Sequence, residues 1–334
     1  SSTEKLILTA GINQENAFGT GTSIGLNFSL GKINQSLALS QYDPYFTEDG
    51  ISRYTDFFYR SNKPLYYVGD PDYQIKSFGS NLKFGVPYTE VDRVFFGSGI
   101  EIFDIYVTQN TPQPYQNYAN AWGVGIPGRL QTYNIPATVG WARDGRDSAL
   151  IPSKGSLQRL SAEVGTPLGN LLFYQLNAQY QQYHSFSKGN ILSFNGEVGY
   201  GEAYSSKPYP ITKNYFVGGI GSVRGYAPGS LGPKYFNTFT GTYLPSGGQS
   251  KIVTNVEYTV PVPGSGIDKT LRVFGFVDGG NAFQDINLVL RYSYGLGLSW
   301  ISPLGPLKFS YGIPIRSQPT DNVQRLQFQV GTAF

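Results

Sequence analysis

The chain has 334 residues, of which 40% are hydrophobic and only 14% are charged, with a formal net charge of +3. It contains no cysteine, which excludes a disulfide framework, a thiolate metal site and a cysteine nucleophile. The small, dispersed net charge argues against nucleic-acid binding, and the 26 Tyr, 22 Phe and 42 Gly are unusual for a soluble domain.

The distribution of apolar residues points to membrane-spanning strands. No run of eighteen apolar residues occurs, so a membrane-spanning helix is not predicted. A closed β-barrel is the other structure that satisfies every backbone group in lipid, and it needs apolar residues only at alternate positions. We therefore expect an all-β, transmembrane antiparallel β-barrel over residues 1–334.

Period-two alternation divides the chain into strands. Residues 174–181 place Tyr, Leu, Ala and Tyr on one face and three Gln and one Asn on the other, so the second face borders a wet lumen. Even positions from 290 to 300 are all apolar or aromatic. In chain order we predict fifteen strands, at residues 5–13, 21–32, 35–42, 51–61, 73–87, 93–107, 132–143, 156–167, 171–186, 190–201, 250–261, 270–281, 289–302, 306–314 and 323–334.

The connections between these strands are of two kinds. Short turns at 43–50, 88–92, 144–155 and 303–305 alternate with longer Gly-, Pro- and Asn-rich loops, which is the pattern of outer-membrane barrels. A soluble β-sandwich would alternate equally well but would not need so many Tyr and Phe at strand ends. The longest connection, 202–249, exceeds the usual loop length, so we expect it to be functional or disordered.

That long loop carries the motif Val223, Arg224, Gly225 and Tyr226. Arginine has five donors and stays protonated, so an Arg on a loop that enters the barrel needs acceptors there. Glu257 and Asp278 meet this need, because both are on the polar face of their predicted strands. The alternative is that both are ordinary solvated lumen carboxylates.

The motif and three further segments resemble a known family. The segments are 43–50 (Asp-Pro-Tyr-Phe, then Asp-Gly), 302–311 (Ser-Pro-Leu-Gly-Pro-Leu, then Phe-Ser-Tyr) and 328–334 at the end of the chain. Together they are similar to the BamA family of outer-membrane assembly factors, within the superfamily of outer-membrane β-barrel insertases and transporters. The resemblance implies that extracellular loop 6 folds into the lumen and that its arginine contacts acidic residues at the positions of Glu257 and Asp278, at about 2.7 to 2.9 Å.

The resemblance also implies a function. It implies an insertase of the bacterial outer membrane that folds other β-barrel proteins through a lateral seam between the first and last strands, with no enzymatic activity and no cofactor. The implied partners are unfolded outer-membrane clients, the lipid bilayer, and accessory lipoproteins that bind periplasmic domains absent from this chain. The residues expected at the seam are Gln327, Gln329, Gly331 and Phe334, with a bend at Gly331.

Two further expectations concern the start of the chain. Bacterial single-chain barrels have an even number of strands, roughly sixteen in this family, so we expect the first strand to lie upstream of Ser1. The chain opens without an initiator methionine or signal pattern, which suggests a processed or excised fragment.

Three alternative functions stay open. A TamA-type assembly barrel or a two-partner secretion transporter would carry the same loop motif. A passive porin would need an open, charged constriction. A barrel enzyme would need a partner for the single histidine, His184, which we expect to face the membrane interface. Residues 144–147 lack the spacing of a calcium site, and 218–221 precede no predicted helix, so no metal or phosphate site is predicted.

Overall fold

One antiparallel sheet of sixteen strands forms the body of the molecule. The computed structural model describes residues 8–30, 34–62, 73–149, 151–187, 189–237, 241–262, 271–284, 289–302 and 305–330. The strands of the sheet are β1 (Leu8–Gln14), β2 (Ser23–Leu30), β3 (Asn34–Asp43), β4 (Ser52–Asn62), β5 (Tyr73–Pro87), β6 (Asp92–Val107), β7 (Gly128–Asn134), β8 (Pro136–Asp144), β9 (Gly155–Gly165), β10 (Phe173–Ser187), β11 (Asn190–Ala203), β15 (Ser250–Pro261), β16 (Leu271–Phe283), β17 (Arg291–Ser302), β18 (Gly305–Ile315) and β20 (Leu326–Val330).

The remaining elements are short and lie in the connections. They are η1 (Ala17–Gly19), α1 (Gln113–Ala121), η2 (Ile211–Lys213), β12 (Gly225–Tyr226), β13 (Lys234–Asn237), β14 (Thr242–Pro245) and β19 (Val323–Gln324). Within the described residues, no helix combines the length and the apolar composition that a membrane crossing requires.

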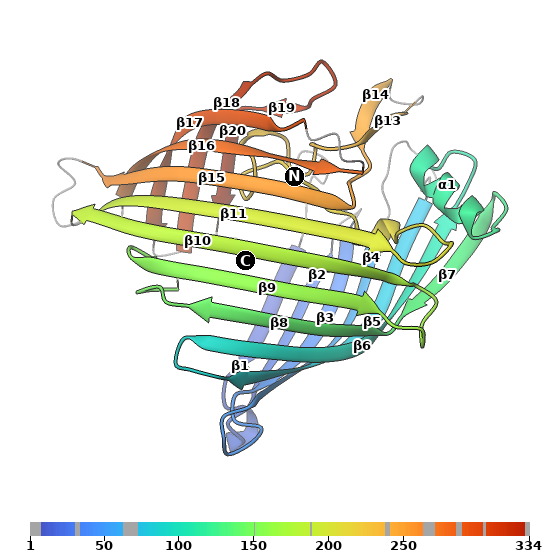
Figure 1. The fold of residues 1–334 in the computed structure, drawn as a ribbon, viewed down its shortest axis with the longest axis horizontal. Coiled ribbons are helices and arrows are strands. Elements are labelled where there is room, and N and C mark those ends of the chain that lie inside the picture. The colour runs from blue at the N-terminus through green and yellow to red at the C-terminus, as the bar shows by residue number, and fades with distance from the viewer. Residues whose placement is uncertain are drawn as a thin grey trace.

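The main path of the sheet runs through fifteen strands, each paired with its neighbour in sequence order, and it skips β7. Figure 1 shows β9, β10, β11 and β15 in front and the blue strands β2 and β3 behind them, so the sheet curves round on itself. In the part of the chain that the structure describes, no ladder joins β1 to β20, and these two strands are the ends of the path.

Two predicted strands are each divided in two. Residues 132–143 were predicted as one strand, but β7 and β8 pair separately with β6 and are interrupted at Ile135. The reason is that Pro136 has no N–H to donate and the Ile135 carbonyl instead accepts from Thr166. Residues 323–334 were also predicted as one strand, but β19 leaves the sheet and pairs with β12 in the long loop.

The two faces of the sheet differ as the alternation predicts. Large apolar side chains on the outer face are exposed, for example Leu296 at 66% and Phe328 at 70%. Polar side chains on the inner face are paired, as where Gln179 donates to Asn195 and Glu197. An apolar outside and a polar inside are typical of a transmembrane β-barrel.

The connections give the sheet its orientation. Short turns, such as 88–91 between β5 and β6, lie at one end, and the longer connections, including 108–127 with α1 and 204–249 with β13 and β14, lie at the other (Figure 1). In outer-membrane barrels the short turns are periplasmic and the long loops extracellular. On this rule β8 ends at the periplasmic side, and β20 runs towards it.

Candidate functional site

Residues 204–249, here called the plug loop, connect β11 to β15 and enter the inside of the sheet. The motif residues Val223, Arg224 and Tyr226 are 0%, 3% and 0% exposed. Val223 and Tyr226 share an apolar cluster with Val253 of β15 and Ala282 of β16. A segment that the alternation pattern could not place is therefore packed against two barrel strands.

Arg224 lies between the two carboxylates that the sequence analysis singled out. Its Nε and Nη2 donate to Asp278 at 2.7 and 2.8 Å, and its backbone N–H donates to the same carboxylate at 3.0 Å. Its Nη1 donates to Glu257 at 2.5 Å. Asp278 is 1% exposed, so this is a charge-assisted, bidentate contact inside the protein. Burial alone would lower the pKa of Arg224, but Asp278 and Glu257 outweigh it and raise that pKa.

An aromatic ring supports the guanidinium from the other side. Arg224 lies 3.6 Å above the ring centre of Phe276, close enough for a cation–π interaction. The Phe276 ring lies over Gly295 of β17, where an added Cβ would be 2.7 Å from the ring. Sequence reasoning missed this residue, although the signal was present: an inward Phe on one strand directly opposite a Gly on the next.

Lys308 and Asn255 complete the cluster. Lys308 of β18 donates to both oxygens of Glu257, at 3.1 and 3.0 Å, so two cations face two carboxylates. Asn255 donates to Asp278 at 2.9 Å and to the Ser222 carbonyl of the plug loop at 2.6 Å. The Arg224 anchor, as we call Arg224, Glu257, Asp278, Phe276 and Lys308, therefore joins the plug loop to β15, β16 and β18.

Gly225 brings the plug loop against the backbone of β18. Its φ of 88° lies in the left-handed region that favours glycine. A Cβ on Gly225 would lie 3.1 Å from Gly312, and one on Gly312 would lie 2.7 Å from the Gly225 nitrogen. Only glycine at both positions permits this approach, so the motif requires a glycine after the arginine.

The plug loop also contacts the end of the chain. Tyr226 donates through its hydroxyl to the Tyr292 carbonyl at 3.2 Å, and its own carbonyl accepts from the Gln327 side chain at 2.7 Å. Of the expected seam residues, Gln327 is thus buried beneath the motif, and Gln329 pairs with Lys308 of β18. Gly331 and Phe334, and the bend expected at Gly331, lie outside the described residues.

A second ionic cluster holds the plug loop to another part of the wall. The Lys213 ammonium lies 2.8 Å from Glu101 of β6 and 2.8 Å from Glu163 of β9. Asn134 of β7, fully buried, donates to the same two carboxylates at 3.1 and 3.2 Å. Burial alone would lower the pKa of Lys213, but the two glutamates outweigh it and raise that pKa. These four residues are here called the Lys213 anchor.

The backbone of Lys213 is fixed as well. Its carbonyl accepts from the Gln175 side chain at 3.2 Å and from the Tyr209 hydroxyl at 3.4 Å. Tyr209 packs edge-on against Phe173 of β10. Sequence reasoning missed the Lys213 anchor entirely, because no motif surrounds Lys213 or either of the two glutamates.

A third ion cluster fixes the loop between β18 and β20. Asp321, whose side chain is 1% exposed, lies 2.5 Å from Lys234 of the plug loop and 2.6 Å from Arg291 of β17. Burial alone would raise the pKa of Asp321, but its hydrogen bonds with Lys234 and Arg291 outweigh it and lower that pKa. The last extracellular loop and the plug loop are therefore joined next to β19.

The other residues considered in the sequence belong to none of these clusters. His184 is exposed on the outer face and stacks edge-on with Phe186 at 4.6 Å. Asp144 and Asp147 each bind within the turn between β8 and β9, to Arg146 and Ser153 respectively. In the described ranges no three His, Asp or Glu side chains are grouped as they would be to hold a metal ion.

Comparisons with known proteins agree on the architecture. The Neisseria meningitidis outer membrane protein assembly factor BamA is 34% identical over 98% of this chain, which covers 45% of that relative, so the chain spans less than half its length. The structure of BamA from Haemophilus ducreyi lacking POTRA domains 1-3 matches with a TM-score of 0.85 at 27% identity, over 97% of this chain and 66% of that one.

A more distant structure shows the fold alone. CdiB from Acinetobacter baumannii matches with a TM-score of 0.59 at 13% identity, over 96% of this chain and 55% of that one. The profile of the Omp85 superfamily domain matches residues 16–334. The fold and that match together show that the chain belongs to the Omp85 superfamily.

Proposed function

We propose that this chain is the barrel of an assembly factor that folds and inserts other β-barrel proteins into the outer membrane, through a lateral seam between the first and last strands of the complete barrel. The observation that carries the proposal is the state of β20. Within the described residues it spans Leu326–Val330 and pairs with β18 on one side. On its other side, no ladder to β1 is present within the described residues.

An open strand edge is suited to this work. An unpaired strand edge presents backbone donors and acceptors that recruit another strand. In a soluble protein this is a hazard, but at a seam it offers a client strand its first partner. The proposed activity therefore needs hydrogen-bond exchange and no covalent chemistry.

The plug loop supports this function over that of a passive pore. It lies within the sheet and is held there by buried ion pairs to β15 and β16 on one wall and to β6 and β9 on another. A porin needs an open constriction, whereas this lumen contains packed loop residues. The partners that follow from the proposal are unfolded outer-membrane clients, together with accessory lipoproteins bound by periplasmic domains.

A reversible disulfide across the seam tests the proposal. This chain has no cysteine, so in the full-length protein Gln327→Cys can be combined with single cysteines in the first strand, once any cysteine outside these residues is replaced. We expect the oxidised pair to stop client insertion and reduction to restore it. Insertion at the unlocked rate by a fully locked barrel would contradict the proposal.

The control is a lock that should be harmless. Leu26 and Leu39 lie opposite each other in β2 and β3, both on the outer face and in an intact ladder. A disulfide between Leu26→Cys and Leu39→Cys should leave client insertion unchanged. Loss of activity in this control would show that any rigid crosslink is inhibitory.

A further inference from the structure

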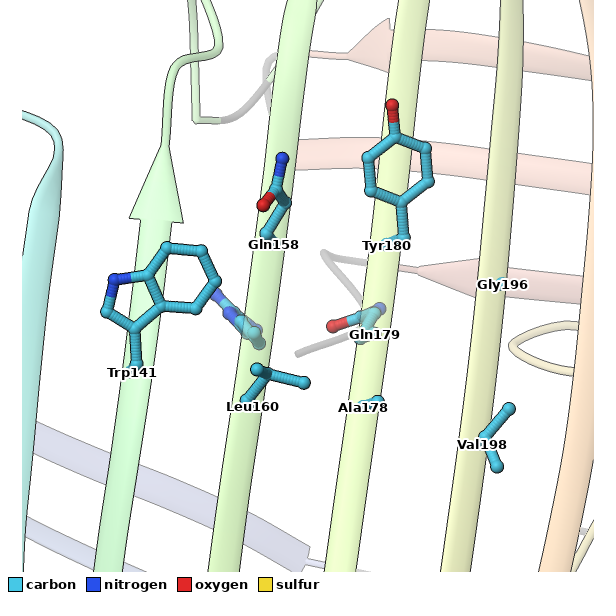
Figure 2. A pocket seen from close by; sticks show the side chains of 9 residues that line it. Trp141, Gln158, Leu160, Ala178, Gln179, Tyr180, Gly196 and Val198 are labelled. Carbon is cyan, nitrogen blue, oxygen red and sulfur yellow. The ribbon is translucent and has the colours of Figure 1, made fainter.

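The outer face across β8 to β11 contains a hollow away from the seam. It has a volume of about 350 Å³ and an almost entirely apolar lining. Trp141, Leu160, Ala178 and Val198 form one row through it, because each is register-paired with the next across the four strands. Figure 2 shows small Ala178 between the larger side chains of Leu160 and Val198, so the row dips at β10.

The adjacent row, nearer the periplasmic end of these strands, is more polar. It runs through Arg143, Gln158, Tyr180 and Gly196, again register partners across β8 to β11. In Figure 2, Gln158 and Tyr180 point towards the end of β8, and Gly196 leaves the hollow open beside Tyr180. The hollow therefore has an apolar floor, the row from Trp141 to Val198, and a more polar rim, the row from Arg143 to Gly196, on its periplasmic side.

Arg159 is the cation within the lining itself, and Arg143 lies beside the lining as the register partner of Gln158. Arg143 is the penultimate residue of β8, and its side chain is 53% exposed. Its carboxylate neighbour is Asp92 at 3.8 Å, a long contact that leaves guanidinium donors available. A planar guanidinium matches a phosphate group well, and at this height an outward side chain reaches the headgroup region of the periplasmic leaflet.

We propose that this hollow binds one phospholipid of the periplasmic leaflet, with an acyl chain over Ala178 and Gly196 and its phosphate accepting hydrogen bonds from Arg143 and Gln158. The inference rests on the placement of the barrel in the outer membrane. The hollow is too small for a partner helix, whose diameter is about 10 to 12 Å. An acyl chain fits a narrow apolar hollow, and the cationic rim suits its headgroup.

Tryptophan quenching by a brominated phospholipid tests the site. This chain has three tryptophans, so, with any tryptophan outside it also replaced by Phe, Trp122→Phe with Trp300→Phe leaves Trp141 as the reporter, and Trp122→Phe with Trp141→Phe leaves Trp300. Trp300 is also on the outer face, 40% exposed, but on β17. In full-length protein in nanodiscs with rising brominated phosphatidylglycerol, we expect Trp141 to reach half-quenching at a severalfold lower lipid fraction than Trp300.

Substitutions separate the two parts of the site. With Trp141 as reporter, Ala178→Phe fills the hollow and should remove the difference from Trp300, whereas the same change at outward-facing Val256 of β15 should not. Arg143→Gln should weaken the preference without abolishing quenching at high lipid fraction.

Each other outcome contradicts a specific part of the inference. Equal curves for Trp141 and Trp300 would show that the hollow holds only exchanging bulk lipid. If Trp141 is protected from quenching by the lipid and the protein can also be chemically crosslinked as a dimer, a second copy of the chain covers this face. Failure of the lipid to quench Trp300 would contradict the bilayer placement itself, and thus the proposed function and not the site alone.

Discussion

The two anchors of the plug loop use different chemistry on different parts of the wall. At the Arg224 anchor, a guanidinium binds carboxylates on adjacent strands, β15 and β16, and stacks on Phe276. At the Lys213 anchor, an ammonium lies between carboxylates of β6 and β9, which are not adjacent, and Asn134 of the intervening β7 bridges them. Arginine suits a bidentate, stacked site, and lysine suits a point between several acceptors.

The comparison shows that the plug loop links two separate parts of the wall. The Lys213 anchor holds it to the strands that also carry α1 and the β9–β10 connection. The Arg224 anchor holds it to the strands next to β20, and Tyr226 continues that contact to Gln327 of β20 itself. Movement of the terminal strand therefore has to disturb the plug loop on one side while the Lys213 anchor keeps it in place on the other.

Arg224→Ala should have the largest effect. It leaves Asp278 buried without its cation, and breaking a buried pair in this way costs about 3 to 5 kcal/mol. The measurement is the midpoint temperature of the heat-induced mobility shift of the folded barrel on a semi-native gel. Arg129→Ala is the matched control, because the Arg129 side chain is 62% exposed in its pair with Asp104 and such exposed pairs contribute about 0 to 1 kcal/mol. Equal shifts for the two variants would show that the Arg224 anchor is not structurally important.

Lys213→Met should have a smaller effect of the same kind. Glu101 and Glu163 keep 15% and 21% exposure, so water relieves part of their repulsion, and we expect a loss of about 2 kcal/mol in the same assay. Adding Glu163→Gln removes one of the unpaired charges and should restore part of the loss. If the double variant is less stable than the single one, charge pairing is not what Lys213 supplies.

Phe276→Leu sharpens the comparison, because only the Arg224 anchor includes a stacked ring. Loss of the ring should destabilise the barrel by about 1 to 2 kcal/mol, combining the cation–π term with a small cavity. Phe309→Leu, on the outer face and 46% exposed, is the control and should change little. A similar result at both positions would assign the effect to side-chain volume alone.

The smallest effect concerns acid pH at Asp321. Its pKa is lowered in the folded protein, so its ion pairs stabilise the fold above the ordinary aspartate pKa, and this contribution is lost as the pH falls towards the folded value. Asp321→Asn should therefore lower the midpoint temperature at neutral pH, and this difference should shrink progressively as the pH falls below about 4, the ordinary aspartate pKa. A difference that does not depend on pH would rule out the charge as the cause.

Most of the sheet could be predicted from the sequence, because alternation reports which face of a strand meets lipid. The same alternation indicated that the side chains of Glu257 and Asp278 face inward, and in the structure both carboxylates form ion pairs with Arg224. Alternation could not detect the interruptions at Ile135 and Arg325, since neither changes which side chains face outward. There the cause is backbone pairing: Pro136 lacks a donor, and β19 pairs with the plug loop.

The Lys213 anchor shows where sequence reasoning stops. Glu101, Asn134 and Glu163 are separated by 29 to 33 residues, and only the barrel register brings them together. Lys213 reaches them from a short 3-10 turn in a loop without periodicity. A prediction of that contact would need the path of the plug loop through the lumen, which depends on packing and not on local pattern.

Ion conductance across planar bilayers tests most directly the claim that two anchors hold the plug loop in the lumen. The set is the unsubstituted protein, Arg224→Ala, Lys213→Met and the double variant. We expect low conductance from the unsubstituted protein, brief openings from each single variant, and a sustained open pore from the double variant that exceeds the sum of the two. Four equal conductances would contradict the claim, because the loop would then stay in place without either anchor.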